Sequence, residues 1–388
     1  MKNLFYIILS FLLLLLLYDC SEEAHNESKS IAELRYLQDY TSPDYFWGYI
    51  DQEGKETINA IYDDTRDFEE GLAAVNYKGY WGFIDLEGNY RIKPTYRSVY
   101  SFSEGYALAQ TFSDTLLVLN NTGQKVLQLT YPEVFSCSSG IFRVKTKQGF
   151  IFLNIEGIPI NQEIYDQAQD FENGFAIVGI NEKVGVIDSG GIEILPLTFT
   201  HISILNKKYI KVLSENNRFK IYNLAQKDFY PGEYRSVLSD GVSSIAVQKE
   251  DSSWNIFDQN MEDYIIVPYP DLYSGGEGKW MYRQDGKFGL LDENGQKLTE
   301  NEFDALYRYS ENRCAFLKGG FWGYLDEKGK EVIPPVLPLA WDYKNGFARI
   351  IANGGIGFID KEGNIVIPPQ FVEVRDFQEN MARFQKFR

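Results

Sequence analysis

Carboxylate and amide side chains recur along this sequence at a nearly constant interval, and they are the residues best suited to chemistry. The series comprises Asp51, Asp85, Asn120, Asn154, Asp188, Asn223, Asp258, Asp292, Asp326 and Asp360. Two carboxylates on either side of a glycosidic bond could hydrolyse a polysaccharide, and clustered oxygen ligands could bind Ca²⁺. The loops that begin at Asp326 and Asp360 each contain a lysine, however, and lack the dense oxygen ligands of a calcium loop. We therefore expect no bound metal.

The same acidic series has a structural explanation. In the segment from Asp85 to Gly88, the aspartate can accept a hydrogen bond from a backbone N–H two residues on, and the glycine can adopt the positive φ that closes a short turn. Turn residues of a tandem repeat lie one repeat apart and do not converge on one bond. We therefore interpret the periodic aspartates as turn caps.

Few other side chains could support catalysis. The two histidines, His25 and His201, cannot form a histidine-based metal cluster, and neither has an obvious nucleophile to assist. No glycine-rich phosphate loop stands between a strand and a helix. Cys137 and Cys314 lie in distant repeats, which favours free thiols over a disulfide. We predict no catalytic residue, no cofactor and no enzymatic activity.

The elements that position these residues are copies of one repeat. Successive members of the acidic series are 34 or 35 residues apart, which gives ten copies. The best copies share the pattern W-G-[FY]-[IL]-D-x-x-G, and its predicted structural residues are Trp47, Gly48, Asp51, Gly54, Trp81, Gly82, Asp85, Gly88, Trp322, Gly323, Asp326 and Gly329. Every copy has an apolar residue at the tryptophan position. We therefore interpret these tryptophans as core residues and not as a surface that stacks against sugars.

Each copy is predicted to contain three short strands. In the second copy, residues 72–75 and 80–84 are apolar runs around a glycine-containing turn, which is typical of a β-hairpin. A third strand ends in Pro94, and a recurrent proline is confined to a sheet edge or a strand end. We expect Gly82 to leave space for a large aromatic neighbour against the backbone.

These motifs resemble the WG-repeat family, also called KWG repeats, from Tyr45 to the C-terminus. The resemblance implies a β-rich bacterial repeat protein, commonly secreted or associated with the envelope, with no established enzymatic activity. Four copies depart from the pattern and carry Leu117, Ile151, Lys220 and Asn255 at the glycine position.

The predicted fold is all-β, with about ten tandem hairpin repeats forming an open or spiralling β-solenoid-like array. The alternative is a closed β-propeller. Four-stranded propeller blades usually need about 40–50 residues and number about 4–8. Ten units of about 34 residues therefore favour the open array.

The N-terminus is predicted to direct export. Residues 4–18 form an apolar run that is too short for a membrane-spanning helix and is typical of a signal peptide, so residues 1–19 are assigned to that signal. Cys20 directly after it resembles the lipid-attachment site of a bacterial lipoprotein. Residues 20–44 would then form a polar tether, and residues 45–388 the repeat array. We expect a lipid-anchored protein at the outer membrane or cell surface, or alternatively a periplasmic or secreted one.

The charge narrows the class of partner. The formal net charge is −17, which argues against nucleic acid and against direct contact with an anionic membrane surface. The function favoured by the sequence is a non-enzymatic, envelope-associated scaffold that binds a protein or a polysaccharide. The alternative is a hydrolase that acts on surface polysaccharide with paired carboxylates. We predict that recognition occurs in the irregular copies between Asn120 and Met261, because a constant scaffold leaves recognition to variable positions.

Overall fold

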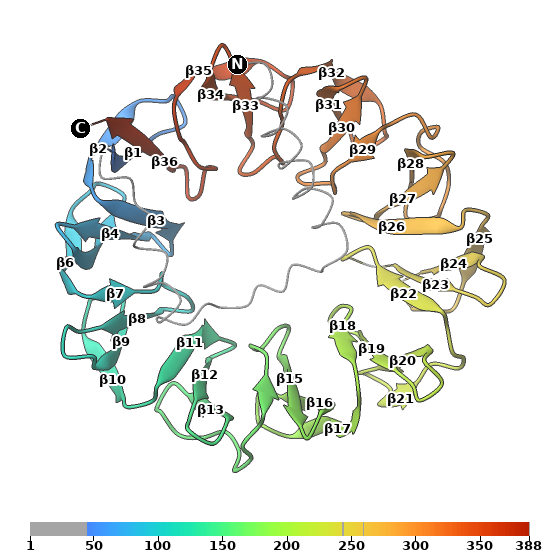
Figure 1. Ribbon diagram of the computed structural model, residues 1–388, viewed down its shortest axis with the longest axis horizontal. Coiled ribbons are helices and arrows are strands. Elements are labelled where there is room, and N and C mark those ends of the chain that lie inside the picture. Colours follow the sequence, from blue (N-terminus) through green and yellow to red (C-terminus); the bar gives the residue numbers. More distant parts are fainter. Residues whose placement is uncertain (1–44, 243, 259, 388) are drawn as a thin grey trace, which may run out of the picture.

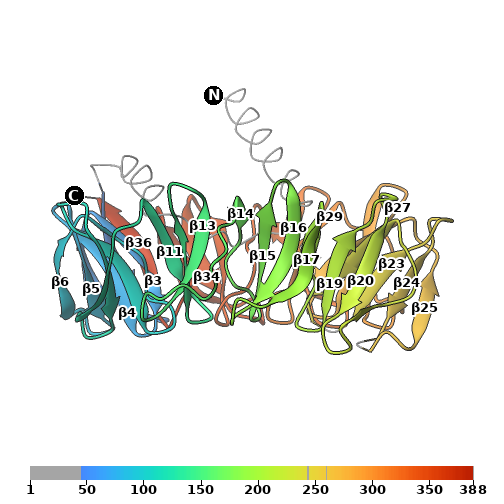
Figure 2. The same ribbon diagram turned by 90° about the horizontal axis from the view of Figure 1, so that it is seen from below.

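The computed structural model describes residues 45–242, 244–258 and 260–387, and this part of the chain is built from β-strands and turns. Its strands form ten antiparallel sheets, which are arranged as blades around a central opening (Figure 1). Seen from the side, the blades form a ring one blade thick (Figure 2). None of the described residues belongs to a helix that could cross a membrane. The predicted signal peptide, Cys20 and the tether lie outside the described residues.

Blade 2 shows how one blade is built. It contains β3 (Asp64–Glu69), β4 (Leu72–Tyr77), β5 (Tyr80–Asp85) and β6 (Tyr90–Tyr96), paired in that order. Strand β3 lies nearest the central opening and β6 lies outermost (Figure 1). Strands β4 and β5 pair without interruption from Leu72↔Asp85 to Tyr77↔Tyr80. Lys78 and Gly79 both have positive φ in the turn between them, as a type I′ hairpin turn requires.

Blades 3 to 10 repeat this arrangement, with three or four strands each. The remaining strands of blades 3 to 6 are β7 (Ser98–Val99), β8 (Tyr106–Gln110), β9 (Leu116–Asn120), β10 (Lys125–Leu129), β11 (Glu133–Ser138), β12 (Ile141–Lys145), β13 (Phe150–Asn154), β14 (Gln167–Ala168), β15 (Phe175–Ile180), β16 (Lys183–Asp188), β17 (Glu193–Phe199), β18 (Ile202–Ile204), β19 (Tyr209–Leu213), β20 (Phe219–Asn223) and β21 (Asp228–Phe229). Those of blades 7 to 10 are β22 (Ser236–Ser239), β23 (Ile245–Gln248), β24 (Trp254–Phe257), β25 (Tyr264–Val267), β26 (Asp271–Gly276), β27 (Lys279–Gln284), β28 (Lys287–Leu291), β29 (Ala305–Leu306), β30 (Cys314–Lys318), β31 (Phe321–Leu325), β32 (Glu331–Leu337), β33 (Ala348–Ala352), β34 (Gly355–Ile359) and β35 (Ile365–Phe371).

Blade 1 closes the ring with both ends of the repeat region. It contains β1 (Tyr45–Ile50) and β2 (Glu56–Tyr62) from the first repeat and β36 (Ala382–Phe387) from the last. Strands β1 and β36 pair in continuous antiparallel register from Tyr45↔Phe387 to Ile50↔Ala382. The N-terminal repeat thus supplies the outer strands of this blade, and the C-terminal repeat supplies its inner part.

The all-β expectation is confirmed, whereas the preference for an open array is wrong. The chain forms a closed propeller, which was the alternative. Repeats of about 34 residues suffice for a blade because one strand often shrinks to two residues, as in β7, β14, β21 and β29. The turns are also short, so the usual length of a propeller blade does not exclude this ring.

The core lies between blades. One hydrophobic cluster joins Leu72 and Phe83 of blade 2 to Val99, Phe102 and Leu119 of blade 3, and similar clusters lie between the other neighbours. Each sheet is therefore covered on both faces by adjacent sheets. A single blade could not bury these faces alone.

The glycine of the Trp-Gly pair is required by the backbone of the next strand. A Cβ on Gly82 would lie 2.4 Å from Ile92 O and 2.6 Å from Pro94 N. The approach is close because β6 bulges there: Trp81 pairs with Tyr96, whereas Phe83 pairs with Ile92. Backbone contacts of this kind recur at Gly48, Gly185, Gly323 and Gly357. The expected aromatic neighbour is not among the nearest atoms at Gly82, whereas the Phe316 ring lies against Gly323 and the Tyr282 ring against Gly289.

The recurrent proline and the glycine of the Trp-Gly pair are both explained by the outermost strand of the blade. Pro94 lies in the outermost strand of its blade, where no further strand needs its missing N–H. In blade 7 the glycine is replaced by Asn255, and β24 and β25 pair there without a register shift. The glycine is thus needed where the outer strand bulges over it.

We expect Gly82→Ala to lower stability by about 3 kcal/mol, the upper end of the cost of overpacking, because its Cβ would meet backbone atoms that cannot rotate away. The matched control is Gly79→Ala, which has nothing within 4 Å of its new Cβ and carries only the strain of φ +83°. That strain costs about 1–2 kcal/mol. Thermal denaturation midpoints of both variants check this difference, and equal midpoints would contradict it.

Candidate binding surface

The predicted turn aspartates lie between the third and fourth strands of their blades. Asp51 Oδ1 accepts hydrogen bonds from Glu53 N at 3.0 Å and Lys55 N at 2.9 Å, and Gly54 N donates to Asp51 O at 2.9 Å. Around Asp326, the N–H groups of Lys328, Lys330 and Gly329 make the same three contacts, at 2.9, 2.8 and 2.9 Å. At Asp85, Oδ1 accepts from Asn89 N at 2.8 Å, and Gly88 N donates to the carbonyl at 2.9 Å. These side chains hold turns in separate blades and do not converge on one site.

A metal site is also absent from the part of the chain that the structure describes. No group of three or more His, Cys, Asp or Glu side chains there could hold a metal ion. Cys137 and Cys314 are buried and unpaired, as expected for free thiols. Burial and the nearby Glu104 raise the pKa of Cys137 to about 12, so this thiol is protonated at neutral pH and a poor nucleophile.

The repeat tryptophans are core residues. Trp47, Trp81 and Trp322 are 7%, 1% and 7% exposed. The Arg66 guanidinium lies 4.9 Å from the ring centre of Trp81, and the Tyr307 ring centre lies 4.6 Å from that of Trp322. These indoles fill the space within and between blades and leave no face free to stack against a sugar.

A belt of glutamates connects neighbouring blades, and the sequence analysis missed it. Glu70 Oε2 accepts a hydrogen bond from Gly105 N at 2.8 Å, and Glu379 Oε2 accepts one from Gly71 N at 2.8 Å. Glu104 accepts from Ser139 N and Gly140 N at 2.8 and 2.5 Å. Each carboxylate caps the turn between the first and second strands of the next blade. The signal was the acidic residue before the turn glycine, for example Glu70 before Gly71.

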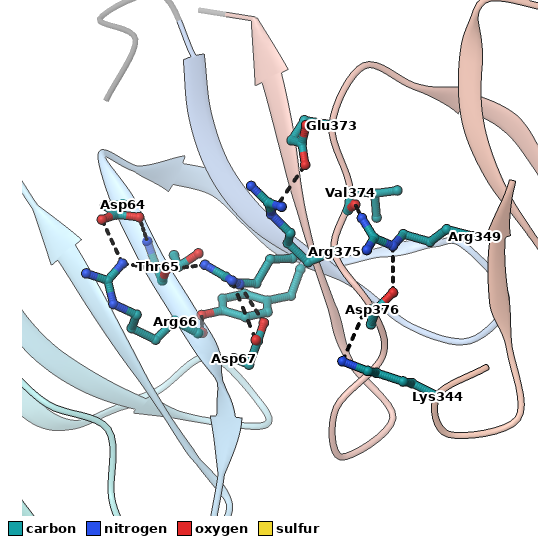
Figure 3. Close-up of polar contacts among 12 residues, drawn as sticks. Asp64, Thr65, Arg66, Asp67, Lys344, Arg349, Glu373, Val374, Arg375 and Asp376 are labelled. Carbon is teal, nitrogen blue, oxygen red and sulfur yellow. Dashed lines mark hydrogen bonds and ion pairs between the residues drawn. The ribbon is translucent and has the colours of Figure 1, made fainter. Parts of the chain in front are cut away.

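Buried or half-buried arginines form a second set of connections between blades (Figure 3). Arg349 donates to Asp376 Oδ1 at 2.5 Å and to Val374 O at 3.1 Å. Arg383 contacts Asp67 Oδ1 at 2.5 Å and Thr65 O at 2.6 Å in the same way. Arg349 lies on β33 of blade 10 and reaches the segment around Val374, which pairs with Phe384 of blade 1, whereas Arg383 lies on β36 of blade 1 and reaches β3 of blade 2. The Arg383 contacts join β36 to blade 2, beside the seam of the ring.

A recess of about 470 Å³ lies beside the equivalent arginine of blade 4, Arg143, and its walls come from blades 4 to 6. Blade 4 contributes Phe135, Arg143 and Phe150, blade 5 contributes Gln167, Gln169 and Val184, and His201 leads into β18 of blade 6. Gln167 lies at the start of a first strand, and Phe150 and Val184 lie at or next to the start of a third strand, which is the end of the blade opposite the aspartate turns. The recess therefore opens on the other face of the ring.

The wall of the recess includes a repeat position that holds tryptophan in four of the ten copies. Val184 occupies the position that Trp47, Trp81 and Trp322 occupy in the regular copies, and it retains the following glycine, Gly185. Valine lacks the indole that fills this region in those blades. Blade 5 thus keeps the Gly of the repeat and places a smaller side chain at the wall of the recess.

The walls of the recess combine aromatic and polar groups. The Arg143 guanidinium lies 3.7 Å from the ring centre of Phe135 and is paired with Asp170 Oδ1 at 2.7 Å. Phe150 is partly exposed. His201 is exposed, and its Nε2 lies 3.3 Å from Ser203 Oγ. This arrangement can bind a small polar ligand, although no sequence motif predicted it.

A second recess of about 510 Å³ lies between blades 3 and 4. Its walls include Asp114, Gln128, Tyr131 and Lys147. Both recesses belong to one arc of the ring, from blade 3 to blade 6. This arc includes the irregular copies at Asn120 and Asn154.

Solved structures resemble this ring only distantly. One is described as the crystal structure of the eukaryotic initiation factor, at 12% identity and a TM-score of 0.48, covering 82% of this chain and 98% of that chain. BamB from Moraxella catarrhalis has 14% identity and a TM-score of 0.32, covering 73% and 94% of the two chains. Hsv2 from Kluyvelomyces marxianus has 10% identity and a TM-score of 0.34, covering 70% and 96%. Such scores carry no argument about function.

The sequence itself matches one family. No curated protein matches the chain. The family described as WG containing repeat matches residues 47–81, 81–111, 164–183, 288–320, 322–355 and 356–386. These segments hold the Trp-Gly pairs, the aspartate turns and the bulged outer strands described above. The chain therefore belongs to the WG-repeat family.

Proposed function

We propose that this protein is a non-enzymatic binding scaffold of a bacterial cell envelope, and that it recognises a protein or polysaccharide through the arc of blades 3 to 6. The observation that carries the proposal is the recess of about 470 Å³ in this arc, where Val184 occupies the position that is tryptophan in the regular copies. A partly apolar recess with a few polar groups is the usual form of a ligand site.

The recurrent residues of the other blades support this assignment because they are already occupied in folding. The tryptophans are buried, the glycines accept a bulged strand, and the aspartates and glutamates cap turns. Repeat proteins commonly keep such a constant scaffold and place recognition where the repeats differ. In this chain, the part that has both irregular repeats and open recesses is the arc of blades 3 to 6.

Attachment to the envelope is the second part of the proposal. A lipid on Cys20 would hold the protein at the outer membrane or cell surface, and residues 20–44 would separate the ring from the lipid. The whole chain carries a net charge of −17, most of it in the repeat region, so anionic lipid headgroups would repel the ring. Contact with the membrane would then be made through the anchor alone. Periplasmic or secreted forms are the alternative locations.

One observation favours a hydrolase as the second candidate. Burial raises the pKa of Asp342 to about 6, and the negative charge of Asp376 contributes in the same direction. A carboxyl group with a raised pKa beside an ionised one is the arrangement of a general acid and its partner. However, neither recess includes these two residues, and Asp376 is already paired with Arg349 and Lys344. We therefore assign Asp342 to the packing between blades.

This assignment makes a pH-dependent prediction. The pKa of Asp342 is raised from 3.8 to about 6, so above pH 6 the folded state carries a buried charge that the unfolded state exposes to water. We expect Asp342→Asn to be more stable than the parent at pH 8, by up to about 3 kcal/mol at 1.36 kcal/mol per pKa unit. The gain should shrink as the pH falls from 6 to 4, because the parent then becomes protonated in the folded state.

Chemical denaturation at pH 8, 6 and 4 checks this, and Asp304→Asn is the control of opposite sign. Lys287 lowers the pKa of Asp304, so that substitution should destabilise the protein at pH 8 and less so in acid. A loss of stability on Asp342→Asn at pH 8 would refute the packing role. If the parent hydrolyses envelope polysaccharide and Asp342→Asn does not, the hydrolase function is supported instead.

Lipidation is tested directly. Metabolic labelling with a palmitate analogue should mark the parent chain and Cys137→Ala, whose substituted thiol is buried, but not Cys20→Ala. Equal labelling of the Cys20→Ala chain would refute the lipid anchor.

Exchange of whole blades tests the binding arc. Residues 167–199 of blade 5 can be replaced by residues 64–96 of blade 2, a segment of the same length in the same repeat frame. We expect this chimera to lose the envelope component that the parent captures in a pull-down from solubilised envelope. The control places the same blade 2 segment at residues 305–337 of blade 9 and should keep the partner. Retention by both chimeras, or no capture by the parent, would count against the proposal.

A further inference from the structure

We propose that the recess between blades 4, 5 and 6 binds a neutral saccharide, with the sugar hydroxyl groups on free side-chain amides and the apolar face of the ring against Phe150. This inference rests on the proposed binding function and adds the chemical class of the ligand.

The size of the recess suits such a ligand. Its volume of about 470 Å³ falls in the range of about 300–1,000 Å³ that is usual for small-molecule sites. One or two sugar units can be accommodated, whereas a folded protein partner could insert only a side chain or two. The walls come from three consecutive blades, whose positions are fixed by the ring.

The charges in the recess favour a neutral ligand. The cation in its wall, Arg143, already donates to Asp170 Oδ1 at 2.7 Å, to Asp170 Oδ2 at 3.4 Å and to Ala168 O at 2.9 Å. Asp166, an exposed carboxylate at the rim, would repel an anion. A phosphate or sulfate would have to compete with Asp170 for a buried guanidinium, and removing a partner from a buried ion pair is costly.

Free hydrogen-bonding groups are present beside this neutral pair. The side-chain amides of Gln167 and Gln169 and the hydroxyl of Thr200 make no hydrogen bond to the described part of the protein. A carboxamide both donates and accepts, as does each hydroxyl group of a sugar. An unpaired amide at the wall of a recess is therefore complementary to a polyol and less so to an apolar ligand.

An aromatic surface completes the site. Phe150 occupies the tryptophan position of its repeat, yet it remains partly exposed in the recess. Lys145 and Arg143 lie 5.4 and 5.5 Å from its ring centre, and both cations are paired with carboxylates, Lys145 with Glu133 Oε1 at 3.9 Å and Arg143 with Asp170 Oδ1 at 2.7 Å. The C–H groups on one face of a pyranose carry partial positive charge and pack well against an aromatic ring.

The valine at the wall of the recess provides the test. Val184→Trp restores the Trp-Gly pair found in regular blades, so it should preserve the fold while filling the recess. The matched control is Ile356→Trp, which restores the same pair at the same repeat position in blade 10, outside the recess. Gln169→Ala removes one free amide without adding volume.

The measurement is titration calorimetry of the purified full-length chain in detergent. The neutral probes are maltohexaose, cellohexaose, laminarihexaose, mannohexaose and chitohexaose, and the anionic probe is hexagalacturonate. We expect the parent and Ile356→Trp to bind at least one neutral probe. Val184→Trp should weaken that binding about tenfold or more, a change of 1.4 kcal/mol or more in binding free energy. Gln169→Ala should weaken it severalfold.

Three results would overturn the inference: the parent binds no neutral probe, it binds only hexagalacturonate, or Val184→Trp binds like the parent. If the melting temperature shows that Val184→Trp has not folded, Gln169→Ala decides, and unchanged affinity there refutes the site. The envelope pull-down separates this inference from the proposed function. If the parent and Val184→Trp capture the same partner, the scaffold function is supported and the saccharide site is refuted.

Discussion

The pairing of β1 with β36 is the constraint on which the rest of the structure depends. Every sheet buries apolar side chains on both faces against its neighbours, so an open array would expose one such face at each end. The continuous register from Tyr45↔Phe387 to Ile50↔Ala382 removes both ends at once. The ion pair of Arg383 with Asp67 then fixes the closing strand against blade 2. Closure therefore allows all ten blades to share a single mode of packing.

Local features of the blade could be predicted from the sequence because each depends on a few adjacent residues. The turn at Asp85, the hairpin before it and the position of Pro94 are of this kind. Closure could not be predicted, since it depends on the small rotation between neighbouring blades summed around the whole ring. The recess was equally hidden because Phe135, Gln169 and His201 come from three repeats. The loss of tryptophan before Gly185 was visible, but a single substitution in a core position gives no sign of open space beside it.

The irregular repeats show which parts of a blade can vary. In blade 7, Asn255 replaces the glycine, and β25 pairs in plain register instead of bulging. In blade 6 the outer strand β21 is reduced to two residues. The central hairpin persists in both cases, with full pairing between β19 and β20 and between β23 and β24. The outer strand thus absorbs sequence change, while the hairpins that carry the contacts between blades keep their geometry.

The offset between repeat and blade has a consequence for how such rings can change in size. Each sequence repeat begins at the third strand of one blade and ends after the second strand of the next, so blade 1 is always shared between the first and last repeats. Duplication or loss of any internal unit would leave both of these shared parts in place. The number of blades could then change through unequal recombination within the gene, because the same pairing of β1 with β36 would still close the ring.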